Sequence, residues 1–262
     1  MQPLSLADEL TVTADGPGIS LACDQAGMPT GESNLVWRAA RKFAEETGIK
    51  VGVQIHLKKR IPVAAGLGGG SSDAAGTLLA LNTLAGGPLD GAGLHRLASQ
   101  LGADVPFFLN SSPAVGRGIG TELTFVSLPP YLYVLLNPGV RISTRWVYEN
   151  LDLASLVPPG PVKPEDWDTD NPGGWVINDL ETVTLKRYPR LREILEALPP
   201  LGALAQGMSG SGPTIFGLFS TAEAAQEAAR RLSRTFPGWL AVVRGLTGAV
   251  PERGWENQVW MI

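Results

Sequence analysis

The sequence predicts an α+β fold with helices packed against short strands. Three observations carry this prediction. Alternating apolar residues mark strands near the N-terminus, stretches of helical periodicity separate them from later strands, and in the C-terminal half two strands each follow a helix. Two strands that each follow a helix, after an antiparallel start, indicate a two-layer α+β arrangement in the C-terminal half.

The first half divides into strands and helices at clear breaks. Residues 9–14 and 19–23 alternate apolar and polar side chains around Asp15-Gly16-Pro17-Gly18, which predicts a hairpin. Ser33 is predicted to cap a helix over 34–47 that Gly48 ends. A strand at 51–57, a helix at 73–85 and a short amphipathic helix at 94–101 follow.

The second half begins with a buried strand at 130–138, bounded by prolines. Residues 157–174 are rich in Pro, Asp and Gly without periodicity, which indicates a surface loop or a junction between domains. Beyond it we expect helices near 176–187, 189–198 and 221–236, with strands at 213–219 and 239–246.

The composition is that of a globular protein, with 44% hydrophobic and 18% charged residues among 262. A net charge of −4 without a basic stripe argues against a nucleic-acid partner. No signal peptide and no apolar run of membrane-spanning length is visible, so no membrane partner is expected. The single cysteine, Cys23, can form no intrachain disulfide, which suits a reducing cytoplasm.

The segment PVAAGLGGGSSDAA (62–75) carries the strongest chemical signal. Four glycines within five positions, Gly66 and 68–70, lie between the predicted strand and the predicted helix. Glycines let backbone N–H groups turn toward one centre, and the first turn of a helix presents unpaired N–H groups and the positive end of its dipole. Together they form a cradle for a phosphate chain, to which Ser71 and Ser72 can add hydroxyl donors or a helix cap.

Other interpretations of this loop fit less well. A flexible linker would not need strand and helix signals at both ends. A Walker loop needs a lysine after its glycines, and none follows here. In a dinucleotide fingerprint a third glycine would stand where Ser71 stands, and Asp90 precedes a helix instead of following a strand.

The glycine segment resembles the nucleotide loop of the GHMP small-molecule kinases. The extra glycine and Asp73 resemble in particular the branch that acts on a cytidine diphosphate-linked methylerythritol in isoprenoid precursor synthesis. Four further segments agree with that branch: SNLVWRAA (33–40), LGADVPFF (101–108), NPGVRISTRWVY (137–148) and GMSGSGPTIFGLF (207–219). The similarity runs from Ser5 to about Phe219.

The resemblance implies a fold, a cofactor and a binding loop. The fold would be an N-terminal domain over 1–145, similar to the second domain of ribosomal protein S5, and a ferredoxin-like domain over 146–262, with the active site between them. ATP would bind, carrying Mg²⁺ with it, and the oligomeric state stays open. The ATP-binding residues would be Lys59, Pro62, Val63, Ala64, Ala65, Gly66, Leu67, Gly68, Gly69, Gly70, Ser71 and Ser72. From the residues alone, Lys59 is equally well a solvated lysine at a strand end.

Asp104 is the candidate catalytic base. In GADVP the glycine and proline fix a tight turn from which a carboxylate can project. The residues alone favour a helix cap or a turn aspartate, whereas the resemblance implies that Asp104 takes the proton of the substrate hydroxyl. We expect Asp73 to interact with the dipole of the helix in its first turn and not to be a catalyst.

The resemblance also implies that Thr144 and Tyr148 bind the cytosine, by hydrogen bonding and by stacking. Ordinary core packing is the alternative for these two residues. The second glycine-serine segment, GMSGSG (207–212), would lie beside the phosphates. His56 and His95 have no Cys or His cluster around them, so we expect structural or surface histidines and no protein-bound metal.

Members of the family normally begin with a segment that contains a Pro-Ala-Lys-x-Asn-Leu strand and, further on, a Gly-Tyr-His motif. The sequence does not contain this segment. Residues 1–3 lead directly into SLADEL (5–10), which in the family follows that segment. We expect that Met1 is an internal methionine and that the reading frame extends upstream; a true truncation is the alternative. The functional alternatives are a non-catalytic nucleotide-binding relative and a GHMP kinase for another small alcohol.

Overall fold

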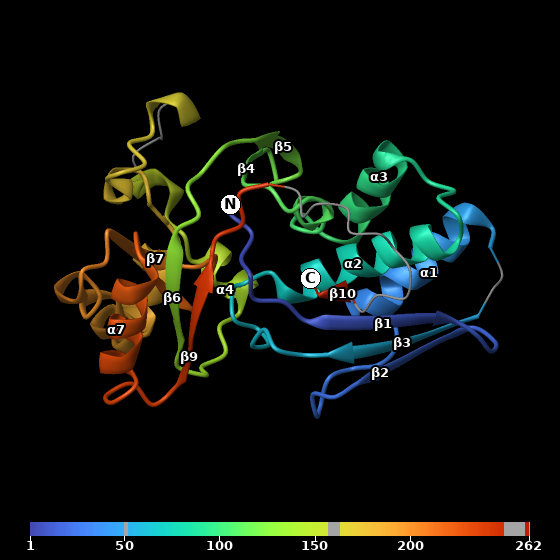
Figure 1. Ribbon diagram of the computed structural model, residues 1–262, viewed down its shortest axis with the longest axis horizontal. Coiled ribbons are helices and arrows are strands. Elements are labelled where there is room, and N and C mark those ends of the chain that lie inside the picture. The colour runs from blue at the N-terminus through green and yellow to red at the C-terminus, as the bar shows by residue number, and fades with distance from the viewer. Residues whose placement is uncertain (50–51, 157–162, 249–259, 262) are drawn as a thin grey trace. The chain divides into compact units, whose positions relative to one another are not determined.

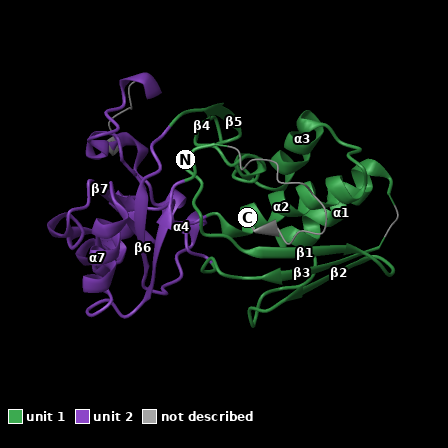
Figure 2. Ribbon diagram, in the orientation of Figure 1, with its two compact units in different colours: residues 1–63, 68–127, 246–262 green, residues 64–67, 128–245 purple. Residues whose placement is uncertain are grey.

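The computed structural model describes all residues except 50–51, 157–162, 249–259 and 262. The chain divides into two compact units, each with its own core (Figure 2). The first comprises residues 1–63, 68–127 and 246–262, and the second comprises residues 64–67 and 128–245. This division starts the second unit at Leu128, before the domain boundary expected at 145/146, because strand β6 (Leu132–Asn137) is the centre of the second sheet.

The first unit is a twisted sheet with helices on one face (Figure 1). The sheet has the order β10-β1-β3-β2, and a separate ribbon pairs β4 with β5. The strands are β1 (Glu9–Ala14), β2 (Ile19–Cys23), β3 (Val53–Lys58), β4 (Ala114–Arg117), β5 (Glu122–Phe125) and β10 (Trp260–Met261). The helices are α1 (Leu35–Thr47), α2 (Gly69–Leu84) and α3 (Gly91–Leu101), followed by the 3₁₀ turn η1 (Pro106–Leu109).

The predicted hairpin of β1 and β2 is wrong. Strand β3 lies between them, antiparallel to β1 and parallel to β2. The turn that joins β1 to β2 spans the end of β3, where a Cβ on Gly52 would come within 1.8 Å of the carbonyl oxygen of Gly16. The alternation of apolar and polar residues identified the strands correctly but not their neighbours in the sheet. This pattern shows only that a strand has one apolar face, and it does not show which other strand lies beside it.

Two helix starts differ from prediction. Asn34, not Ser33, caps α1, since its side chain accepts from the amide of Val36; the predicted end at Gly48 is confirmed, with φ at 68°. Helix α2 starts at Gly69, four residues before the predicted start. Gly68 takes up a left-handed conformation at its N-cap, with φ at 70°, so two of the loop glycines already belong to the helix.

The second unit is an antiparallel sheet in the order β7-β8-β6-β9, with α6 and α7 packed on it. This is the strand order of a ferredoxin-like βαββαβ unit. Its strands after β6 are β7 (Ala205–Met208), β8 (Ile215–Phe219) and β9 (Trp239–Arg244). Its helices are α4 (Thr144–Glu149), α5 (Glu181–Arg187), α6 (Pro189–Glu196) and α7 (Ala222–Leu232).

Sequence analysis missed four of the described strands, namely β4, β5, β7 and β10. Strands β4 and β5 were not predicted because their register pairs only four residues, among them Gly116. Strand β7 was not predicted because it overlaps the glycine-serine segment at 207–212. Of the predicted loop at 157–174, residues 157–162 lie outside the described part, and the rest contains two short 3₁₀ turns, η3 (Pro164–Asp166) and η4 (Pro172–Gly174).

Candidate active site

Helix α2 begins with glycines, from its N-cap at Gly68 through Gly69 and Gly70. The amide of Ser72 makes the first helical bond, 2.9 Å from the carbonyl oxygen of Gly68. The amides of residues 69–71 therefore have no partner four residues earlier in the helix. Gly70 is exposed and Gly69 and Ser71 are half-buried, so ligands can reach this turn. The arrangement is that of a phosphate site at a helix N-terminus.

The two serines have different roles. Ser72 is buried, and its hydroxyl donates to the carbonyl oxygen of Gly69 at 2.8 Å, so it does not cap the helix. Of the two alternatives for the serines, the helix cap is wrong, since the N-cap is Gly68 and no side chain caps the helix there. Within the described chain no hydrogen bond occupies the Ser71 side chain, which leaves its hydroxyl free to donate to a ligand.

Residues 64–67 of the glycine segment belong to the second unit, where the loop 209–214 holds them. The hydroxyl of Ser209 donates to the carbonyl oxygen of Gly66 at 2.8 Å, and the amide of Thr214 donates to Ala65 at 3.3 Å. Ala64 and Gly66 both have positive φ, 54° and 75°. The predicted second glycine-serine segment thus contacts the first segment directly.

Side chains of residues 178–184 brace this second segment. The side-chain nitrogen Nδ2 of Asn178 donates to the carbonyl oxygens of Met208 and Gly210, at 2.7 and 2.8 Å. The carboxylate of Glu181 accepts from the backbone amide of Met208 at 2.7 Å. Sequence analysis did not identify either residue, because nothing in the sequence around them indicates a partner thirty residues away.

Asp104 lies exposed in the turn between α3 and η1. Among the described residues its carboxylate accepts no hydrogen bond, so neither a cap nor an Asx turn accounts for it. The turn is rigid, because Val105 and Pro106 beside it are buried. The ring of Phe108, in η1, occupies the space a Cβ on Gly68 would need, at 2.7 Å. The structure therefore brings the turn of Asp104 against the start of α2.

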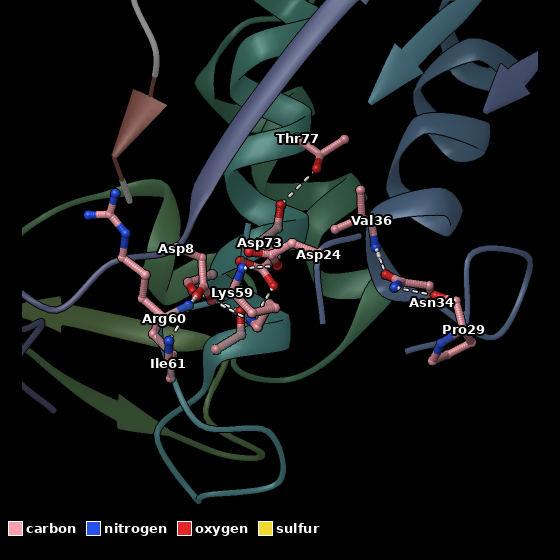
Figure 3. A network of polar contacts seen from close by, with 12 residues as sticks. Asp8, Asp24, Pro29, Asn34, Val36, Lys59, Arg60, Ile61, Asp73 and Thr77 are labelled. Atoms are coloured by element: carbon pink, nitrogen blue, oxygen red, sulfur yellow. Dashed lines mark hydrogen bonds and ion pairs between the residues drawn. The ribbon is translucent and has the colours of Figure 1, made fainter. Parts of the chain in front are cut away.

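Lys59 lies inside the protein and not in solvent (Figure 3). Its ammonium contacts the carboxylate of Asp8 and lies 2.7 Å from that of Asp73. Only 5% of the Lys59 side chain is exposed, against 1% and 3% for the two aspartates. The interpretation of a solvated strand-end lysine is wrong. The expected interaction of Asp73 with the helix dipole in the first turn is also wrong, because Asp73 is the fifth residue of α2 and pairs with Lys59.

The electrostatics of this cluster follow from burial. Desolvation is the largest effect on Asp73 and raises its pKa to about 7; Lys59 opposes the shift and Asp8 adds to it. Desolvation lowers the pKa of Lys59, but the two carboxylates outweigh it and leave this pKa above the ordinary value for lysine. The neighbouring basic residues Lys58 and Arg60 both pair with Glu9, so the basic cluster at 58–60 is neutralised locally.

Thr144 and Tyr148 stand one helical turn apart on α4 in the second unit. The Thr144 hydroxyl lies 2.8 Å from that of Ser211. Tyr148 is 61% exposed, and in the described part of the chain no ring or hydrogen-bonding group contacts its side chain. The alternative of core packing is therefore wrong for Tyr148, and its ring face is free to stack on a ligand.

Across the described residues, no group of three or more His, Cys, Asp or Glu side chains is arranged to hold a metal ion. His56 and His95 are both exposed. No helix in the described ranges combines the length and the apolar character that crossing a bilayer requires.

Comparisons with known proteins show which family the chain is similar to. The models of the GHMP kinase N-terminal and C-terminal domains match residues 34–112 and 167–238. The 4-diphosphocytidyl-2-C-methyl-D-erythritol kinase of Geobacter sp. strain M21 is 44% identical over 92% of this chain and 86% of its own length. A crystal structure of 4-(cytidine 5'-diphospho)-2C-methyl-D-erythritol kinase is 38% identical, with a TM-score of 0.79 over 93% of this chain and 88% of that one.

A third similarity concerns the fold alone. The homoserine kinase of Cytophaga hutchinsonii is 22% identical, with a TM-score of 0.74 over 92% of this chain and 86% of that one. The predicted α+β, two-domain GHMP kinase fold is thereby confirmed. The chain belongs to the 4-diphosphocytidyl-2-C-methyl-D-erythritol kinase family of the GHMP kinases and is an ATP-dependent small-molecule kinase.

Proposed function

We propose that this chain transfers the γ-phosphoryl group of ATP to the 2-hydroxyl of 4-diphosphocytidyl-2-C-methyl-D-erythritol. The products are the 2-phosphate and ADP, and the place of the reaction is the cytoplasm, where ATP is supplied. The relatives that are 42–44% identical over more than nine tenths of the chain carry this activity in their names. The observation that carries the proposal is the start of α2, with three unpaired amides beside the turn of Asp104.

The phosphates of ATP bind at the glycine segment. The amides of residues 69–71 and the hydroxyl of Ser71 donate to phosphate oxygens, and residues 62–68 shape the approach. These residues fit the group, since the glycines leave room for close backbone approach and the helix end favours negative charge. Mg²⁺ carried on the phosphates of ATP would neutralise charge that develops during transfer.

Asp104 acts as the general base. It accepts the proton of the 2-hydroxyl as the oxygen attacks the γ-phosphorus, and the bond from this phosphorus to the bridging oxygen of ADP breaks. A carboxylate without an internal partner, held on a rigid turn, is free to accept that proton. Thr144 and Tyr148 bind the cytosine, Tyr148 by stacking on the base.

An ADP-release assay with a panel of alcohols tests the proposal. We expect turnover with the cytidyl substrate and none with homoserine or mevalonate. Turnover of either small alcohol without turnover of the cytidyl substrate would assign the chain to another GHMP reaction. ATP binding without turnover of any of them would favour a non-catalytic nucleotide-binding protein.

A further inference from the structure

The cluster of Asp8, Lys59 and Asp73 joins three separate elements of the first unit. Asp8 immediately precedes β1, Lys59 immediately follows β3, and Asp73 lies on α2. The pairing of β1 with β3 sets Glu9 opposite Lys58, which places Asp8 beside Lys59. Figure 3 shows the ammonium of Lys59 between the two carboxylates.

The backbone that leads into the glycine segment is held by the same cluster. One carboxylate oxygen of Asp8 accepts from the amides of Arg60 and Ile61, at 2.6 and 2.9 Å. The amide of Lys59 donates to Asp24 at 2.8 Å. Three consecutive amides after β3 are therefore bound by carboxylates, which leaves the chain little freedom as it enters the glycine segment.

Gly69 is the point where this cluster meets the first turn of α2. A Cβ on Gly69 would lie 3.0 Å from the Cγ2 atom of Ile61 and 3.4 Å from the ammonium of Lys59. The lysine head therefore rests against the backbone of the turn whose amides are unpaired. Asp73, one turn further along the same helix, anchors the helix to the other side of the ammonium.

Stability alone is a poor account of this cluster. Burying three charged groups carries a desolvation cost that their attraction roughly repays, and an apolar replacement is often as stable. Two carboxylates around one ammonium also leave an excess negative charge. In the described structure, the Oδ1 atom of Asp73 is buried without a hydrogen-bond partner. Such an arrangement costs free energy of folding, but it holds the three side chains and the backbone around them in one orientation. A phosphate site needs its binding groups to be held in this way.

We propose that Lys59 is a positioning residue, which Asp8 and Asp73 hold so that it fixes the end of β3 against the first turn of α2. In this role Lys59 sets the position of the amides of residues 69–71 and contributes to ATP binding through them. The inference rests on the proposed ATP site at α2. It differs from direct contact of the Lys59 ammonium with the nucleotide, because this ammonium is buried and donates to two carboxylates.

Variants of Asp73 separate the two roles. Asp73→Ala removes one of the two groups that hold the ammonium. A positioning role predicts that KM and Kd for ATP rise about tenfold to a hundredfold, because small displacements of positioning groups are that costly. Asp73→Asn keeps an oxygen that accepts from Lys59, so we expect it to rescue both values to within about threefold of wild type. The KM for the cytidyl substrate should stay unchanged in both variants.

Lys59→Met should raise Kd for ATP by as much as Asp73→Ala does, whereas Lys58→Met is the matched control. Lys58 is half exposed and pairs only loosely with Glu9, at 3.9 Å, so its loss should leave Kd unchanged. If Lys59→Met does not fold, the two Asp73 variants decide the question. Titration calorimetry with ATP gives Kd, and circular dichroism reports how much protein is folded.

The outcomes are distinct. A wild-type Kd for ATP in folded Asp73→Ala would overturn the inference, because ATP binding would then not depend on how Asp73 holds the ammonium. An equal loss in Asp73→Asn and Asp73→Ala would overturn it too, since the amide oxygen can still accept from Lys59. If the wild-type chain itself binds no ATP, the proposed function fails before this inference is tested.

Discussion

Replacing Gly66 by alanine tests how residues 64–67 are held in the second unit. The added Cβ would lie 2.3 Å from the carbonyl oxygen of Ser209 and 2.8 Å from that of Gly212. Both obstacles are backbone atoms, which cannot rotate away as a side chain can. The φ of 75° adds strain for any residue with a side chain.

The magnitude follows from two contributions. A left-handed alanine costs about 1–2 kcal/mol, and overpacking against fixed atoms costs about 1–3 kcal/mol more. Gly202→Ala is the matched control, because Gly202 lies in the same unit with φ at 89° and nothing within 4 Å of its Cβ position. It should show the first contribution alone. The difference between the variants, about 1–3 kcal/mol, then measures the contact of the two loops.

Urea denaturation of both variants, followed by tryptophan fluorescence, gives the free energies of unfolding. We expect Gly66→Ala to be the less stable variant, with a raised KM for ATP as well, while Gly202→Ala keeps the wild-type KM. Equal stabilities for the two variants would refute the reasoning, because the loop contact would then add nothing to the cost of the positive φ.

Three further predictions concern single side chains. Asp104→Asn should lower kcat by about 10²–10⁴ with little change in KM for ATP, and wild-type turnover in a steady-state assay would remove Asp104 from its role. Tyr148→Ala should raise the KM for the cytidyl substrate about 5- to 150-fold at unchanged stability, since stacking on a base contributes about 1–3 kcal/mol; an unchanged KM would exclude stacking. The raised pKa of Asp73 means that the folded state binds more protons than the unfolded state between about pH 4 and 7, so stability falls as pH rises through this window. Asp73→Asn should remove this fall, which is on the order of a few kcal/mol, and denaturation at several pH values measures it; parallel pH profiles would contradict the assignment.

Local sequence patterns predicted the helices and strands well where short-range features determine where an element lies or ends. Gly48 ends α1 because a left-handed residue is needed there, and alternation located β1 and β2. Strand order was not predictable in this way, since the partner of a strand is set by packing across the chain. The start of α2 was placed late because four glycines argue against a helix by propensity, whereas a Cβ on Gly69 would come within 3.0 Å of the Ile61 side chain.

In the candidate site, too, the local features were predictable from the sequence and the features that depend on strand pairing were not. The helix start with its unpaired amides was predictable from the glycines and the adjoining helix pattern, both of which are local features. The buried pairing of Lys59 with Asp8 and Asp73 was not, because it depends on the register of β1 with β3. A signal was present in the sequence: Asp8 stands one residue before β1 and Lys59 one residue after β3, so an antiparallel pairing brings them together.

The central claim is that the unpaired amides at the start of α2 bind the phosphates of ATP. Protein labelled with ¹⁵N in glycine and serine allows the amide resonances of Gly69, Gly70 and Ser71 to be followed by NMR during a titration with Mg-ATP. We predict that these three resonances shift most among the glycine and serine amides, and that cytidine diphosphate alone moves them far less. Resonances that stay in place at saturating ATP, while other glycine and serine amides shift, would contradict the account.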